Sequence, residues 1–143
     1  MKYHFKIHRE KEGFWAECLE LEGCVTQAET IEELCDNMQD ALNLYIEEPE
    51  DSKFLAPFPD QSIKVSKTVV EVPVNPQIAF AASVRNNRLQ KGLTQQQVAK
   101  MMGFDKIYSY QRLESKSCNP SLKTISKIKE VFPELSLDIA LSC

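Results

Sequence analysis

The chain has 143 residues, of which 43% are hydrophobic, and it carries a formal net charge of −4. This composition is typical of a folded globular protein with room for one ordinary domain or two small ones. No run approaches the roughly 20 apolar residues of a membrane-spanning helix, and the N-terminus MKYHFKIHRE alternates where a signal peptide would be continuously apolar. The sequence therefore predicts a cytoplasmic protein without a membrane partner.

Three strands are predicted at the start of the chain. Apolar and polar residues alternate over residues 2–8, which indicates a strand with one buried face. A second strand is expected over residues 14–21, and a third around residues 24–25. His4 and His8 fall opposite the apolar face of the first strand, so we expect both to be exposed.

A helix and a fourth strand complete this first module. Thr30 and Glu33 have the spacing of a capping box, and apolar residues then recur in steps of three and four up to Glu48, just before Pro49. Residues 62–72 alternate loosely again and predict a strand that returns to the sheet. The expected order is βββαβ, with the helix covering one face of a small sheet.

The rest of the chain predicts short helices. Capping residues, glycines and prolines bound them at about residues 76–91, 94–103, 106–114 and 122–131. The side chains expected on one face of the last of these helices are Leu122, Ile125 and Ile128. The tail LSLDIAL, residues 135–141, alternates with period two and favours a strand, with a short helix as the alternative. Together the two modules predict an α+β protein.

The charges divide between these modules. Residues 1–75 contain 16 Asp and Glu against 7 Lys and Arg, a net of −9, whereas residues 76–143 contain 5 against 10, a net of +5. We expect one domain over residues 1–72, a linker at 73–75 and a second domain over 76–143. Such asymmetry is typical of a protein whose basic half meets a polyanion and whose acidic half meets another partner. Chance variation between two solvated surfaces is the alternative.

No catalytic or metal-binding pattern stands out. The five cysteines form no CxxC pair and have no histidines at metal-ligand spacing, so we interpret them as reduced thiols, mostly in the core. His4 and His8 lack a nucleophile or carboxylate at motif spacing. The acidic residues crowd the predicted helix and loops, where they suit solvent or a basic partner, instead of projecting from the sheet to hold metal ions. We predict no enzyme, no catalytic residues, no cofactor and no metal.

The stretch GFWAECLELEGCVTQAETIEEL, residues 13–34, contains an aromatic pair after glycine, a Leu-x-Gly-Cys corner, Thr26 with Gln27, and the capped helix. In this order and spacing the features resemble the HicB family, antitoxins of bacterial toxin–antitoxin pairs. Leu19 departs from the proline of that pattern. The resemblance implies a partial ribonuclease-H-like fold that has lost catalysis and binds a small basic ribonuclease toxin of the HicA type.

Residues 88–103, RLQKGLTQQQVAKMMG, include a small residue and a glycine suited to a tight turn between helices. With residues 112–128, RLESKSCNPSLKTISKI, they are similar to Cro/repressor-type (XRE-like) helix-turn-helix domains. The spacing from Gly103 to Glu114 is one residue longer than in that family, which lengthens the turn. Lys116 replaces the usual glycine and adds a positive charge.

The resemblance sets a register for the second helix of this motif, in which Tyr110 and Leu113 face inward. The residues expected to contact DNA are Gln95, Gln96, Lys106, Tyr108, Ser109, Gln111, Arg112 and Lys116. Arginine can bind guanine and glutamine can bind adenine by paired hydrogen bonds, while Gln95 and Gln96 suit a phosphate. The alternative is a set of solvated polar residues on a four-helix domain. The fold also implies an ion pair between Arg88 and Glu114.

These features predict an antitoxin that neutralises a HicA-type mRNA-cleaving toxin by direct binding and represses its own operon. We expect it to bind an inverted-repeat operator as a homodimer or a higher even-numbered oligomer, with the tail as an edge strand across the two-fold axis. The alternative is a solitary transcription regulator whose N-terminal domain binds a small ligand or dimerises.

Overall fold

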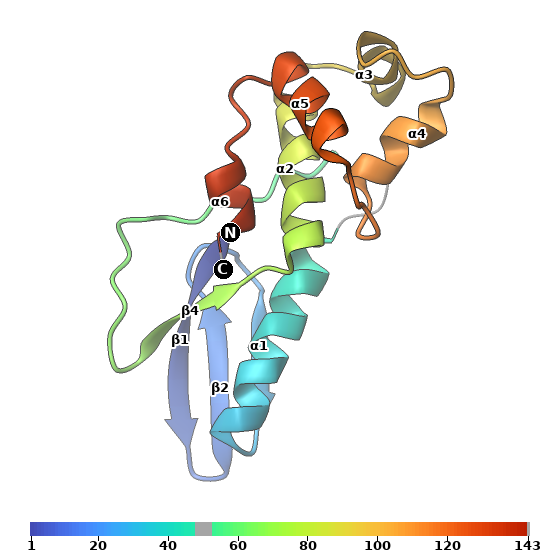
Figure 1. The fold of residues 1–143 in the computed structure, drawn as a ribbon. Coiled ribbons are helices and arrows are strands. Elements are labelled where there is room, and N and C mark those ends of the chain that lie inside the picture. The colour runs from blue at the N-terminus through green and yellow to red at the C-terminus, as the bar shows by residue number, and fades with distance from the viewer. Residues whose placement is uncertain (48–52, 143) are drawn as a thin grey trace. The chain divides into compact units, whose positions relative to one another are not determined.

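The computed structural model describes residues 1–47 and 53–142, which form two compact units (Figure 1). The N-terminal unit contains Met1–Ile46 and Ala56–Asn75 and includes Ser142, whose carbonyl and hydroxyl oxygens accept hydrogen bonds from the Met1 amine at 2.7 and 2.8 Å. In chain order its elements are β1 (Lys2–Glu10), β2 (Gly13–Cys18), β3 (Val25–Ala28), α1 (Ile31–Ile46) and β4 (Val69–Pro73). The βββαβ order predicted from the sequence is confirmed.

The N-terminal unit is an antiparallel sheet with α1 over one face (Figure 1). The strands lie in the order β3-β2-β1-β4, and β1 pairs with both β2 and β4. The largest buried side chains of this unit come from alternate strand positions and from one side of α1, as expected for an amphipathic helix on a sheet. They include Tyr3, Phe5, Leu21, Leu34, Met38 and Leu42.

Two strands are shorter than the sequence pattern predicts. β2 ends at Cys18, because the chain turns through Gly23, which has a φ of +81°, and the Cys24 N–H donates to the Leu21 carbonyl. β4 begins only at Val69, because the Ser66 hydroxyl accepts hydrogen bonds from the N–H groups that follow it and holds a local turn.

The predicted cap of α1 is present in part. The Thr30 hydroxyl accepts from the Glu33 N–H at 3.2 Å, but the Glu33 carboxylate accepts from the Glu29 N–H and not from that of Thr30. The last turn predicted for this helix, at Glu48 and Pro49, lies outside the described residues.

His4 is buried, with 4% of its surface exposed, so the prediction of an exposed strand residue is wrong. Its Nδ1 lies 2.7 Å from Oε1 of Glu20, whose carboxylate also accepts from the N–H of His4 and of Asp60. The alternation placed His4 on the correct face of β1, but it carried no information about the later segments that cover that end of the sheet. His8 is partly exposed.

The second unit contains Pro76–Leu141, together with Glu47 and residues 53–55 from the segment after α1. Its elements are α2 (Pro76–Gln90), α3 (Gln95–Met101), α4 (Ile107–Gln111), the 3-10 helix η1 (Arg112–Glu114), α5 (Leu122–Val131) and α6 (Leu137–Leu141). Their shared core includes Phe80, Val84, Val98, Tyr110, Ile128 and Phe132. An N-terminal sheet followed by helices makes the chain an α+β protein, as predicted.

The C-terminal tail is the helix α6, so the favoured prediction of a strand is wrong. The Ser136 hydroxyl accepts from the Ile139 N–H, and its carbonyl accepts from the Ala140 N–H. Helical spacing then places Leu137 and Ala140 on one side, against the core of the helical unit. A dimer contact through an edge strand at this tail therefore has no structural basis.

The three apolar residues predicted on one face of α5 differ in burial. The Leu122 side chain is 85% exposed, although Ile125 is partly buried and Ile128 is fully buried. Leu122 is the first residue of α5, directly after the capping residue Ser121, and the inner face of the helix begins only one turn later.

Among the described residues, no helix is both long and apolar enough to cross a membrane, and no group of three His, Cys, Asp or Glu is placed to hold a metal ion. Cys18, Cys24 and Cys118 are buried free thiols, in agreement with the prediction, whereas Cys35 is exposed. Cys143 lies outside the part of the chain that is described.

Candidate nucleic-acid interface

α3 (Gln95–Met101) has the capping residue and the terminating glycine that the sequence predicts. The Thr94 hydroxyl accepts from the Gln97 N–H at 3.1 Å, and the Gln97 side chain accepts from the Thr94 N–H at 2.8 Å, which completes the capping box. After α3 the chain turns at Gly103, whose φ of +76° belongs to the left-handed region that favours glycine. Val98 and Ala99 are the buried residues on the inner side of α3.

The second helix of the motif, predicted to start at about Lys106, is α4 and starts at Ile107. Lys106 has an extended backbone and precedes α4, which is followed directly by η1. Tyr110 and Leu113 are buried, which confirms the predicted inward register of this helix.

Most of the predicted DNA-contacting residues lie at the surface of the helical unit. The exposed members of the set are Gln96, Lys106, Tyr108, Ser109, Arg112 and Lys116. Arg112 lies over the ring of Tyr108, with its guanidinium carbon 6.0 Å from the ring centroid. The basic and aromatic side chains of α4 and η1 thus share one outward side.

Gln95 and Gln111 are half-buried and contact each other instead of projecting to solvent. The Gln111 Nε2 donates to Oε1 of Gln95 at 3.2 Å, and the Gln95 Nε2 donates to Oε2 of Glu114 at 2.9 Å. The structure therefore separates these two amides from the six exposed residues. A contact of either amide with DNA would have to replace or extend these hydrogen bonds.

The predicted ion pair between Arg88 and Glu114 is confirmed. Arg88 Nε lies 2.6 Å from Oε1 of Glu114 and Nη2 lies 3.0 Å from Oε2, so the contact is bidentate. The two side chains are only 7% and 4% exposed. The Tyr110 hydroxyl also donates to Glu114 Oε1 at 2.6 Å, and burial followed by the Glu114 charge raises the pKa of Tyr110.

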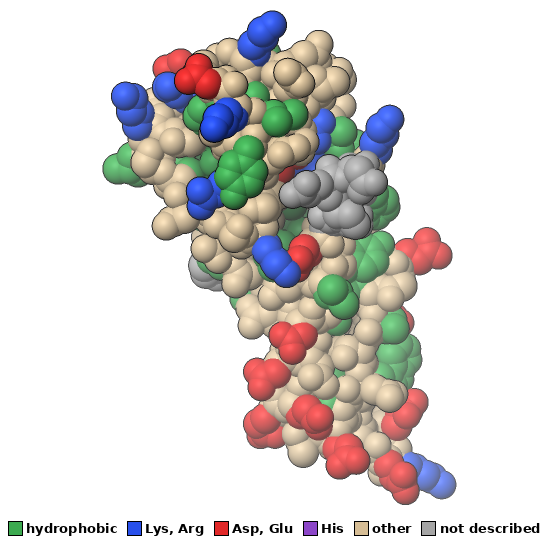
Figure 2. Space-filling model, turned by 90° about the vertical axis from the view of Figure 1, so that its right-hand side faces the viewer, with side chains coloured by type: hydrophobic (Ala, Val, Ile, Leu, Met, Phe, Trp, Pro, Cys, Tyr) green, Lys and Arg blue, Asp and Glu red, His purple; other side chains and the backbone are tan. Residues whose placement is uncertain are grey.

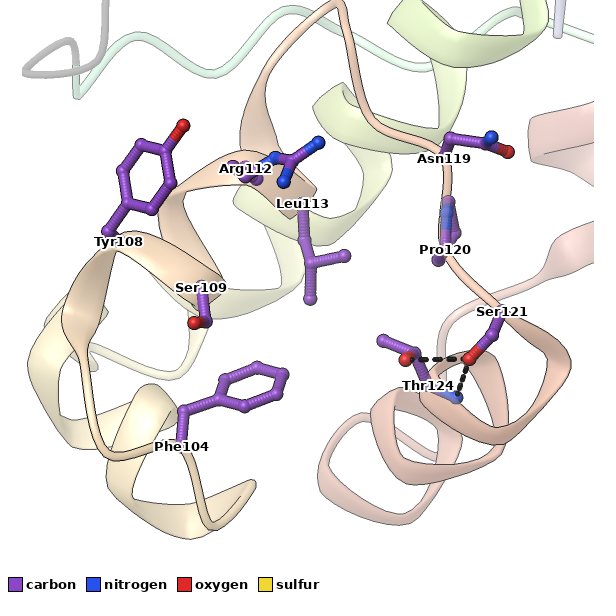
Figure 3. Close-up of a pocket in the computed structure, with 9 residues that line it drawn as sticks. All are labelled: Phe104, Tyr108, Ser109, Arg112, Leu113, Asn119, Pro120, Ser121 and Thr124. Carbon is purple, nitrogen blue, oxygen red and sulfur yellow. Dashed lines mark hydrogen bonds between the residues drawn. The ribbon is translucent and has the colours of Figure 1, made fainter.

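A cavity of about 260 Å³ lies beside the outward side of α4 (Figure 3). Tyr108, Ser109 and Arg112 line it from the α4 and η1 side. The opposite wall comes from the loop before α5 and the first turn of that helix, with lining residues Asn119, Pro120, Ser121 and Thr124. This wall was not among the predicted site residues. The stretch NPSL, residues 119–122, lies within the residues that resemble helix-turn-helix domains, and with the capping spacing of Ser121 and Thr124 it could have indicated this wall.

Within this wall, Ser121 holds the first turn of α5. Its hydroxyl accepts from the Thr124 N–H at 3.2 Å and lies 3.0 Å from the Thr124 hydroxyl, as Figure 3 shows. The cavity combines a guanidinium group, hydroxyl groups and an amide, which are all groups that bind phosphate oxygens.

Lys116 is exposed but already paired within the helical unit. Its Nζ lies 2.9 Å from Oε1 of Glu47, and the Lys116 side chain is 67% exposed. Because exposed ion pairs contribute at most about 1 kcal/mol, this pair leaves Lys116 able to exchange its partner for a phosphate.

Residues 84–139 match the protein family described as helix-turn-helix. The match runs from within α2 into α6 and thus includes α3, the turn and α4. No curated protein matches the chain. The match supports the helix-turn-helix predicted from residues 88–128, and it indicates the DNA-binding domain of a transcription regulator.

Proposed function

We propose that the protein is an antitoxin that binds a basic, HicA-type mRNA-cleaving toxin through residues 1–72 and represses its own operon through residues 76–143. Residues 73–75 then connect the two domains. The helix-turn-helix match supports the regulatory part. The resemblance of residues 13–34 to HicB antitoxins motivates the toxin-binding part.

The division of charge carries the proposal. On the face drawn in Figure 2, Asp and Glu side chains gather over the N-terminal unit, while Lys and Arg side chains gather over the helical unit. α1 contributes exposed acids to the first surface, among them Glu32, Asp36 and Asp40. An acidic surface attracts a cationic protein and repels DNA, whereas a basic surface does the reverse. Each unit thus suits one of two partners of opposite charge.

In the DNA complex, the exposed side of α4 and η1 enters the major groove. Arg112 reads a base, whereas Lys106 and Lys116 bind phosphates, with Gln96 at the start of α3 and Ser109 beside them. Tyr108 supports the Arg112 guanidinium through the contact between them. Gln95 and Gln111 join the interface if hydrogen bonds to DNA replace the one between their side chains. One short helix reads few base pairs, so a two-fold pair of domains on an inverted repeat supplies the specificity.

Co-expression with the product of a neighbouring short, basic reading frame tests this function. We expect the two proteins to copurify, and the chain to relieve growth arrest caused by the neighbour. Pull-downs with residues 1–75 and with residues 76–143 then locate the contact, and only the first should retain the basic protein. Retention by residues 76–143 alone would reject the assignment of toxin binding to the N-terminal domain. If the chain binds its operator but neither copurifies with the neighbouring basic protein nor relieves the growth arrest, the solitary regulator is favoured.

A further inference from the structure

The face of the sheet opposite α1 carries a row of side chains from three strands. Ala16 and Cys18 of β2 are buried on the face that α1 covers, so Trp15 and Glu17 project to the other face. The strand register pairs Trp15 with His8 on β1 and with Gln27 on β3.

Trp15 is fixed on its β1 side. The His8 and Trp15 rings are stacked, with centroids 4.0 Å apart and an interplanar angle of 11°. His8 Nε2 is buried and has no hydrogen-bond partner among the described residues, and Oε1 of Glu17 lies 3.7 Å from it. The indole is therefore held in place before any ligand arrives.

On its β3 side, Trp15 borders a cavity of about 360 Å³. Glu10, Val25, Thr26 and Gln27 complete the lining. Val25 is 56% exposed, and Glu10 is exposed at the end of β1. The cavity thus combines an aromatic ring, an aliphatic side chain, a carboxylate and a side-chain amide.

We propose that this cavity binds the guanidinium group of an arginine side chain on a partner protein. A guanidinium can stack on the indole, donate paired hydrogen bonds to the Glu10 carboxylate and donate another to the Gln27 amide oxygen. Lysine fits less well, because its ammonium is a point charge without a planar face. The carboxylate and the net acidic N-terminal half disfavour a phosphate in the same place.

The proposal deepens the proposed function and rests on it only for the identity of the partner, a basic toxin. An arginine buried against a tryptophan is the type of contact that dominates binding energy at protein interfaces. The cavity then serves as the anchor point, and the exposed acids elsewhere on the unit contribute mainly to the rate of encounter.

Trp15 is the one tryptophan of the chain, so its fluorescence reports on the cavity directly. The full chain is titrated with a short peptide containing several arginines and, separately, with the same peptide carrying neutral citrulline in their place. We expect a saturable fluorescence change with the arginine peptide and none with the citrulline peptide. The Glu10→Gln variant should bind the arginine peptide about three- to fivefold more weakly. Glu12→Gln, an equal change at the exposed hairpin turn, should not change the affinity. Equal responses to both peptides, or equal affinities of the two variants, would overturn the proposal.

A second measurement separates this proposal from the antitoxin function. The neighbouring basic protein is titrated against the full chain and against the charge reversals Glu10→Lys and Glu12→Lys. A loss of at least about tenfold for Glu10→Lys alone supports the cavity as the anchor. Equal tight binding of both variants refutes the cavity while the antitoxin function stands. A response to the arginine peptide without binding of the neighbour leaves the cavity supported and rejects that toxin as its partner.

Discussion

Removing the Glu114 carboxylate should destabilise the helical unit far more than removing an exposed carboxylate. Glu114 accepts four hydrogen bonds, two from Arg88, one from Tyr110 and one from Gln95, and its side chain is 4% exposed. The Glu114→Ala variant leaves the Arg88 guanidinium buried without a counter-charge. Breaking one side of a buried ion pair typically costs about 3–5 kcal/mol.

The structure places the expected cost near the lower end of that range. Arg88 keeps a hydrogen bond from Nη1 to the Leu93 carbonyl at 3.0 Å after the carboxylate is gone. Water can also enter the space left by the side chain and solvate the guanidinium in part. We therefore expect Glu114→Ala to lower the free energy of unfolding by about 3 kcal/mol, and Glu130→Ala, at an exposed position of α5, by less than about 0.5 kcal/mol.

Urea unfolding of the full chain, followed by far-UV circular dichroism, measures these changes, while Trp15 fluorescence reports separately on the N-terminal unit. The Arg88→Ala, Glu114→Ala double variant completes a thermodynamic cycle. It should be more stable than the sum of the single effects predicts by at least about 1 kcal/mol, because it removes both charges together. A Glu114→Ala effect as small as that of Glu130→Ala, or strict additivity in the cycle, would refute the reasoning.

Three further expectations follow from the helical unit. Arg112→Ala should weaken operator binding by about 1–3 kcal/mol and relax the base preference at one position. Lys116→Ala should weaken binding to all duplexes alike and lower the salt slope by about one. Titrations of operator and random duplexes at several salt concentrations distinguish the two variants. The raised pKa of Tyr110 contributes stability that is present below about pH 10 and falls above it by up to about 1.4 kcal/mol per pH unit, so Tyr110→Phe should flatten this alkaline decline in urea midpoints. The chain should occupy two half-sites about 34 Å apart, or a multiple of that, as an even-numbered oligomer, and light scattering that shows a monomer both alone and on DNA would contradict this.

Local signals in the sequence predicted the helices of the DNA-binding motif well. The capping box at Thr94 and Gln97 and the glycine at 103 act within one turn of their own position, so their spacing determines where α3 begins and ends. The resemblance gave the helical register that predicted Tyr110 and Leu113 as inward-facing, because residues three positions apart on a helix lie on the same face. These predictions needed no knowledge of distant residues.

The predictions that failed, or that missed a contact, depended on residues far apart in the sequence. His4 is buried and its imidazole contacts the carboxylate of Glu20, 16 residues away. Alternation along one strand cannot indicate a contact of this kind. The tail alternates with period two, yet Leu137 and Ala140 also match a helix, and only the core of the helical unit decides between the two patterns. Gln95 and Gln111 are 16 positions apart, and no periodic pattern in the sequence predicts the contact between them.

Glu114 links the stability of the helical unit to the candidate DNA-binding surface, because it accepts hydrogen bonds from residues in the interior and from a residue near the surface. Towards the interior it holds Arg88 on α2 and the Tyr110 hydroxyl, and towards the surface it holds Gln95, whose Oε1 in turn accepts from Gln111. α2, α3 and α4 are therefore joined through one carboxylate. If the two helices of the motif shifted against each other, these short bonds would break at a buried site, where unsatisfied polar groups are costly. The same carboxylate that stabilises the fold thus ties α3 to α4. In the DNA complex that we propose, this tie would keep Arg112 at a base while Gln96, at the start of α3, stays beside a phosphate.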